Sequence, residues 1–133
     1  MARQRTPRPT DAELAILQVL WQRGPCTVRD VHEHLKQKRS TGYTTTLKLM
    51  QIMAEKGLVS RDESRRTHVY RARLGQGRVQ RQLVDDLMER AFGGSARKLV
   101  MQALSARKVS ADELDRIRRL MDTLKRGKGD GGS

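Results

Sequence analysis

The stretch that decides the fold is YTTTLKLMQIMAEKGLVSRDESRRTHVYRA, residues 43–72. Its first half carries apolar or small side chains at steps of three and four residues, the spacing of one helical face: Thr46, Leu49, Met50 and Met53. Gly57 ends this helix, and residues 58–62 and 67–72 then alternate as two short strands around residues 63–66. The stretch therefore predicts a helix followed by a β-hairpin whose turn holds two adjacent arginines.

The opposite face of the predicted helix is polar and carries no acidic residue before Glu55. It presents hydroxyls, one cation and one amide: Thr44, Thr45, Lys48 and Gln51. The major groove of DNA is about 12 Å wide and admits one helix, whose side chains reach base edges while flanking cations meet phosphates. The face is suited to a polyanion, although any amphipathic surface helix also has a polar face.

Two further helices are predicted before this stretch. Thr10 and Glu13 have the spacing of a capping box at the start of a helix over residues 11–22, which Gly24-Pro25 ends. Thr27 and Asp30 open a second helix over residues 28–37. Three helices followed by a hairpin predict a winged helix-turn-helix.

The remainder of the chain carries wide apolar stripes at helical spacing. Three helices are expected, and fifty residues are too few to bury such stripes alone, so we expect a second copy to cover them. The predicted dimerisation residues are Leu83, Leu87, Leu99, Val100, Leu114, Ile117, Leu120, Met121 and Leu124. Alternatively, the stripes serve only as additional core for the first half of the chain.

The sequence thus predicts a mostly α protein with a small β-hairpin, a winged helix-turn-helix followed by a three-helix dimerisation region. Four segments are expected: a flexible basic arm (1–9), a winged-helix DNA-binding domain (10–75), a helical dimerisation region (76–125) and a disordered tail (126–133).

The charge of the chain favours an anionic partner. The 28 Lys and Arg against 15 Asp and Glu leave a formal net charge of +13 on 133 residues. Nucleic acid is the default partner of such a chain. A basic RNA- or ribosome-associated module is the rival interpretation, although the aromatic residues are too scattered for a stacking platform. An adaptor whose winged helix binds protein is a third.

Catalysis, metal binding and membrane insertion are not expected. The soft-metal candidates are one cysteine and three histidines, and His32 and His34 face different ways on a helix. No glycine-rich phosphate loop occurs, and no serine or cysteine has a recognisable base partner, so neither an enzyme nor a cofactor is predicted. The longest apolar stretches are about four residues, against about twenty needed to span a bilayer. With Cys26 as the single thiol and no signal-peptide pattern, a cytoplasmic protein is expected.

Three segments together resemble the penicillinase-repressor family, the BlaI/MecI/CopY transcriptional repressors. They are PTDAELAILQVLWQRGPCTVRDVHEHL (9–35), residues 43–72 quoted above, and the helical region that follows. Within them T-x-x-E-x-x-I-L-x-x-L-W, T-V-x-x-V, Y-T-T and E-K-G-L occur in the order and spacing of the family. The resemblance covers residues 9–125 and implies a homodimeric winged-helix repressor that binds a palindromic double-stranded DNA operator.

The resemblance also implies residue roles. The candidate DNA-binding residues are Tyr43, Thr44, Thr45, Lys48 and Gln51 on the recognition helix, and Arg65, Arg66 and Thr67 on the wing. In many members a membrane sensor metallopeptidase detects a β-lactam, and proteolysis within the dimerisation region follows. The matching segment here, residues 99–105, has Gln102 and Ala103 where well-known members have an Asn-Phe bond. Copper-responsive members carry C-terminal cysteine pairs that this chain lacks, so copper sensing is disfavoured.

Overall fold

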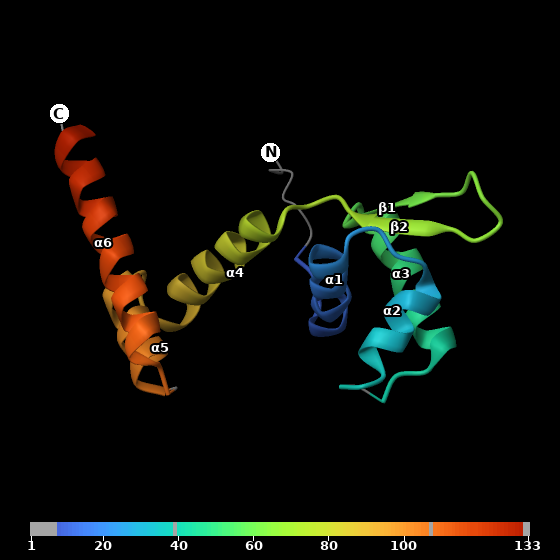
Figure 1. Cartoon of the computed structure of the whole chain (residues 1–133), viewed down its shortest axis with the longest axis horizontal. Helices are drawn as coiled ribbons and strands as arrows, with labels where there is room; N and C mark the ends of the chain where they lie inside the picture. The colour runs from blue at the N-terminus through green and yellow to red at the C-terminus, as the bar shows by residue number, and fades with distance from the viewer. Residues whose placement is uncertain (1–7, 39, 107, 132–133) are drawn as a thin grey trace. The chain divides into compact units, whose positions relative to one another are not determined.

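A computed structural model describes residues 8–38, 40–106 and 108–131. It contains the helices and strands labelled in Figure 1: α1 (Asp11–Arg23), α2 (Val28–Leu35), α3 (Tyr43–Lys56), β1 (Val59–Asp62), β2 (Val69–Ala72), α4 (Gln76–Ala91), α5 (Ala96–Ala106) and α6 (Ala111–Gly131). The predicted fold class, mostly α with a small β-hairpin, is confirmed. Two compact units divide the chain, Met1–Asp85 and Asp86–Ser133, called here the winged-helix unit and the C-terminal unit.

Reciprocal capping boxes fix where α1 and α2 begin. The Thr10 hydroxyl accepts a hydrogen bond from the Glu13 N–H at 3.2 Å, and the Glu13 carboxylate accepts one from the Thr10 N–H at 2.9 Å. Thr27 and Asp30 repeat the arrangement at α2, with both bonds at 3.1 Å. Both predicted helix starts are therefore confirmed, while α2 ends at Leu35, two residues before its predicted end.

The hairpin pairs antiparallel from Val59↔Ala72 to Asp62↔Val69. The backbone of Cys26, in the loop between α1 and α2, also pairs with Tyr70 through N–H···O bonds of 2.9 and 2.7 Å. This bridge ties the start of α2 to the second strand of the wing. The prediction that the second strand begins at Thr67 was wrong, because β2 begins at Val69 and Thr67 lies in the turn.

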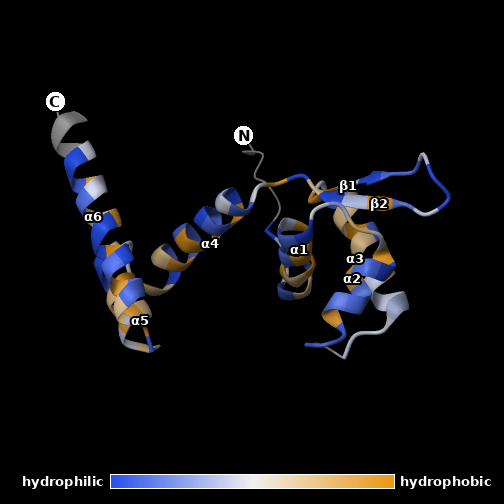
Figure 2. Ribbon diagram, in the orientation of Figure 1, coloured by the Kyte–Doolittle hydropathy of each residue, from blue (hydrophilic) through white to orange (hydrophobic). Residues whose placement is uncertain are grey.

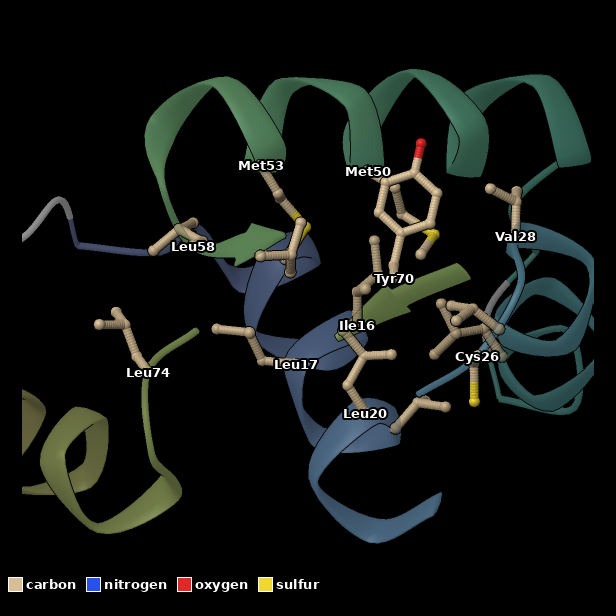
Figure 3. Close-up of a cluster of buried hydrophobic side chains, with 14 of the residues drawn as sticks. Ile16, Leu17, Leu20, Cys26, Val28, Met50, Met53, Leu58, Tyr70 and Leu74 are labelled. Atoms are coloured by element: carbon tan, nitrogen blue, oxygen red, sulfur yellow. The ribbon is translucent and has the colours of Figure 1, made fainter. Parts of the chain in front are cut away.

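The core of the winged-helix unit gathers side chains from α1, α2, α3 and the hairpin (Figure 3). Met50 and Met53 of α3 are fully buried, as the helical spacing predicts, and Leu49 is half-buried against the cluster. Thr46 is also fully buried, and its hydroxyl donates to the Gly42 carbonyl at 3.2 Å. This bond satisfies the one polar group that the buried face of α3 contributes.

The winged-helix unit extends into α4, beyond the predicted boundary at residues 75/76. Val79 is fully buried in the winged-helix core, and Leu83, one turn later, packs against that core. The Trp21 indole N–H donates to the Leu74 carbonyl at 2.9 Å and holds the approach to α4. Leu83 is among the residues predicted for dimerisation, and that role stays a prediction; in the structure its side chain packs against the winged-helix core, because an apolar helical stripe does not reveal which neighbour covers it.

The C-terminal unit comprises the end of α4 with α5 and α6, and Figure 2 shows hydrophobic residues recurring between hydrophilic ones along these helices. The Ser110 hydroxyl caps α6 by accepting from the Glu113 N–H at 3.0 Å. The structure continues α6 to Gly131, past residue 126, where the sequence predicts the tail to begin. Once a helix is established, each added residue gains a hydrogen bond without a new nucleation cost. No helix within the described ranges is both long and apolar enough to cross a membrane.

Of the predicted basic arm (1–9), the structure describes only residues 8 and 9. Residues 1–7 lie outside the described ranges, and Pro9 is buried, so the packed chain already includes the last residue assigned to the arm.

Candidate nucleic-acid interface

One side of α3 is exposed along its length. All five predicted helix positions are exposed: Tyr43, Thr44, Thr45, Lys48 and Gln51. The last four lie opposite the buried face, whereas Tyr43 lies on the side of α3 that contacts α2. The first turn of α3 contains no acidic residue, and its N-cap is Gly42, without a side-chain hydrogen bond. Gly57 ends the helix with φ +83°, a conformation that favours glycine. The structure thus presents short hydroxyls, an amide and a cation on one continuous surface.

The wing places its three predicted residues, Arg65, Arg66 and Thr67, in an exposed turn. Asp62 shapes this turn, since its Oδ1 accepts from the Ser64 N–H at 2.9 Å. Hydrogen bonding to that N–H holds the pKa of Asp62 below its ordinary value. The wing therefore combines a carboxylate that is hydrogen-bonded within the turn, that of Asp62, with exposed arginine side chains.

A further arginine of the wing, Arg61, is already engaged. Its Nη2 lies 2.7 Å from the Glu63 carboxylate, and its Nε donates to the same oxygen at 2.8 Å. Hydrogen bonds to Tyr70 and then to Glu63 raise the pKa of Arg61. Glu63 thus offsets the charge of Arg61, whereas Arg65 and Arg66 form no salt bridge among the described residues.

A hollow of about 500 Å³ lies between the start of α2, the side of α3 and the wing. Its lining residues come from all three elements: Thr27, Val28, Arg29, Tyr43, Leu47, Gln51, Arg61, Arg66, Thr67, His68 and Tyr70. Four predicted DNA-binding residues meet here, Tyr43, Gln51, Arg66 and Thr67, whereas Thr44, Thr45, Lys48 and Arg65 do not line it. Sequence reasoning missed Thr27, Arg29, Arg61 and His68 as neighbours of this surface, because only the fold brings α2 beside the wing.

Tyr43 is held between two side chains of α2. The Arg29 guanidinium carbon lies 6.0 Å from the centroid of its ring, at the outer limit of a cation–π contact. The His32 ring meets Tyr43 edge to face, with centroids 5.8 Å apart. The His32 Nδ1 is buried without a hydrogen-bond partner in the described structure. Tyr43 therefore begins α3 in contact with α2.

A buried ion pair joins the start of α1 to the end of α3. The Glu13 carboxylate, only 2% exposed, receives the Lys56 ammonium at 2.9 and 3.0 Å. Burial alone raises the pKa of Glu13, but hydrogen bonds from Thr10 and the contact with Lys56 outweigh it and lower the pKa below its ordinary value. The pair helps to fix α3 against α1.

The C-terminal unit exposes large apolar side chains. Seven of these residues are between 40% and 57% exposed: Leu87, Val100, Met101, Leu114, Leu120, Met121 and Leu124. Leu99 and Ile117 are half-buried. The two predicted cleavage residues, Gln102 and Ala103, are exposed within α5 rather than in a loop.

The cysteine and histidines that are candidates for metal binding do not form a cluster of metal ligands in the described structure. The described residues include no group of three or more His, Cys, Asp or Glu placed to hold a metal ion. Cys26 is buried, and burial followed by the nearby charge of Asp30 raises the pKa of its thiol.

The chain is similar to known proteins along nearly its whole length. The penicillinase repressor family model matches residues 9–123. The transcriptional regulator BlaI of Mycobacterium tuberculosis is 35% identical over 120 residues, which are 90% of this chain and 86% of that protein. The penicillinase repressor of Bacillus licheniformis is 21% identical over 126 residues, 94% of this chain and 98% of that protein. The solution structure of the DNA-binding domain of the repressor BlaI superposes with a TM-score of 0.49 at 20% identity, over 56% of this chain and 90% of that one. The chain belongs to the penicillinase repressor family, a family of transcriptional repressors and not of enzymes.

Proposed function

We propose that this chain represses transcription as a homodimer that binds a palindromic DNA operator. The observation that carries the proposal is the exposed face of α3, which carries no acidic residue before Glu55 in its last turn, beside the arginines of the wing. A recognition helix must offer hydrogen-bonding groups to base edges without repelling phosphates, and this face does so. The family membership supports the repressor role.

The exposed residues of α3 and those of the wing contact different parts of the DNA in this proposal. Lys48 and Gln51 offer groups suited to guanine and adenine edges, while Thr44 and Thr45 bond base edges or phosphates. Arg65, Arg66 and Thr67 neutralise or bond the adjacent backbone, which positions the protein without reading sequence.

The C-terminal unit supplies the dimer. Exposed leucine, valine and methionine side chains remain on α4, α5 and α6 when one chain is considered by itself. Contiguous exposed apolar surface on a small protein marks an interaction site. Two-fold pairing of identical chains presents two identical reading heads, which a palindromic operator matches.

Release from DNA follows cutting of the dimer region in this proposal, in response to β-lactam or cell-wall stress. A membrane sensor metallopeptidase is the partner that the family resemblance favours, acting on this chain in the cytoplasm. The bond between Gln102 and Ala103 lies inside α5, so a protease must first unwind part of that helix. An isolated helix as short as α5 is marginal in water, which favours such local opening.

Binding to duplexes selected from a random pool tests the reading function. With on the order of ten phosphates neutralised per dimer, the logarithm of the affinity should fall with the logarithm of salt at a slope of about −9. Lys48→Ala should change base preference, whereas joint Arg65→Ala and Arg66→Ala should weaken all duplexes more evenly. Equal affinity for selected and scrambled duplexes, or tighter binding of structured RNA at the same salt, would contradict the proposal.

A further inference from the structure

The hollow between α2, α3 and the wing carries several cations and no carboxylate in its lining. The cations are Arg29, Arg61 and Arg66, and neither Asp nor Glu is among the described residues that line the hollow. We infer that this hollow is a phosphate site, in which Arg29 of α2 and Arg66 of the wing hold one phosphodiester of the DNA backbone from two sides. The inference rests on the proposed DNA-binding function and adds α2 to the DNA-contacting surface.

The acidic groups nearest the hollow already have partners. Asp30 closes the capping box of α2 by accepting from the Thr27 N–H at 3.1 Å. Glu33 lies 2.8 Å from the Lys36 ammonium, although the Arg29 charge also contributes to lowering its pKa. Glu63 forms a salt bridge with Arg61. Within the described structure, neither Arg29 nor Arg66 forms a salt bridge, although the Arg29 charge also acts on Glu33.

The walls of the hollow also offer neutral groups that suit a phosphate oxygen. The Thr27 oxygen accepts the Asp30 N–H at 3.1 Å, which leaves the Thr27 hydroxyl hydrogen to donate. Thr67 and the Gln51 amide line the same space. A volume of about 500 Å³ accommodates a phosphodiester with bridging water. Charge-assisted bonds from arginine are the strong contacts that a phosphate forms with protein.

The two sides of the hollow that carry Arg29 and Arg66 are joined by backbone hydrogen bonds in the chain without DNA. The Cys26–Tyr70 backbone bridge joins the segment that precedes α2 to β2 of the wing. Arg29 lies over the Tyr43 ring, which orients the guanidinium at the edge of the hollow. Such preorganisation lowers the ordering cost of binding. The neighbouring Arg65 differs, because it does not line the hollow and its charge acts on Asp62.

The test is a methylphosphonate scan, in which each backbone phosphate of the selected duplex is replaced in turn by a neutral group. With the full-length chain, one position in each half-site should weaken binding about tenfold. Arg29→Gln, which keeps part of the side-chain stem over Tyr43, and Arg66→Gln should each lose the penalty at that position. Arg65→Gln is the matched control: it weakens binding generally but keeps the penalty. Circular dichroism of each variant confirms that the fold is retained.

Persistence of every phosphate penalty in both Arg29→Gln and Arg66→Gln would overturn the site. A second arm follows the Arg29 and Arg66 Nε–H signals by NMR as inorganic pyrophosphate is added without DNA. Saturation of both signals together with no coupling in the scan would assign the hollow to a free anion instead of DNA. If the random pool yields no preferred duplex, the operator proposal fails separately. The phosphate site is then judged with a nonspecific duplex, where joint shifts of both signals support it and unchanged signals overturn it.

Discussion

Glu13→Gln removes one charge from the ion pair between α1 and α3 while keeping an oxygen that can accept from the Thr10 N–H. The carboxylate is 2% exposed, whereas the Lys56 side chain is 34% exposed, so water can partly solvate the cation left behind. Losing a partner from a fully buried pair costs about 3–5 kcal/mol. Hydrogen bonds to a charged group contribute about 1.5–3 kcal/mol. Because Lys56 reaches solvent, we expect the lower range, about 2 kcal/mol at pH 7.

The effect should depend on pH in a defined direction. The pKa of Glu13 is lowered in the folded chain, so its contribution is complete above the unfolded-state pKa of about 4.3 and is lost as pH falls through the folded-state value. The difference in unfolding free energy between wild type and Glu13→Gln should therefore be largest at neutral pH. It should shrink as the pH is lowered from 5 to 3.

Urea unfolding followed by Trp21 fluorescence measures this difference. Trp21 is the only tryptophan in the sequence, and its bond to the Leu74 carbonyl makes it a reporter of the winged-helix unit. With a slope of about 1 kcal/mol per molar urea, the midpoint should fall by about 2 M at pH 7. Glu63→Gln is the matched control at an exposed pair and should change stability by less than about 1 kcal/mol. Equal midpoints at pH 7, or a difference that is undiminished at pH 3, would refute the reasoning.

Three further changes test the two units. Ile117→Asp with Leu120→Asp puts charges on the proposed dimer surface, and sedimentation should then show a monomer; a monomeric wild type at micromolar concentration would contradict the dimer. A fragment of residues 1–102 should keep the circular dichroism of the winged-helix unit yet bind a palindromic duplex about a hundredfold more weakly, since avidity is lost; undiminished affinity would exclude release by cleavage there. Val79→Ala should lower the free energy of unfolding reported by Trp21 by about 1–2 kcal/mol; an unchanged value would place the unit boundary back at residues 75/76.

The features that the sequence predicted correctly are local ones. A capping box depends on two residues three apart, so Thr10 with Glu13 and Thr27 with Asp30 mark helix starts whatever the rest of the chain does. The buried face of α3 follows from helical spacing in the same way. The exposed face opposite it was therefore predictable together with the core.

The features that the sequence missed depend on contacts between distant segments. Arg29 and Arg66 line one hollow although 37 positions separate them, and no periodicity relates the first turn of α2 to the turn of a hairpin. Likewise, the stripe through Val79 and Leu83 is equally compatible with a dimer partner or with the winged-helix core. The glycines near the end of the chain disfavour a helix only weakly, at about 1 kcal/mol each, and α6 continues through Gly127.

The position of Cys26 decides how the protein responds to thiol chemistry. Its side chain is 5% exposed, and its sulfur lies 3.3 Å from the Gly24 carbonyl oxygen. Burial raises the pKa of the thiol, so little of the reactive thiolate is present at neutral pH. Oxidants and maleimides therefore have poor access to the one cysteine in the sequence. A cysteine introduced at an exposed wing position such as Arg65 would be labelled selectively, and paired spin labels there would report the spacing of the two reading heads in the proposed dimer on DNA.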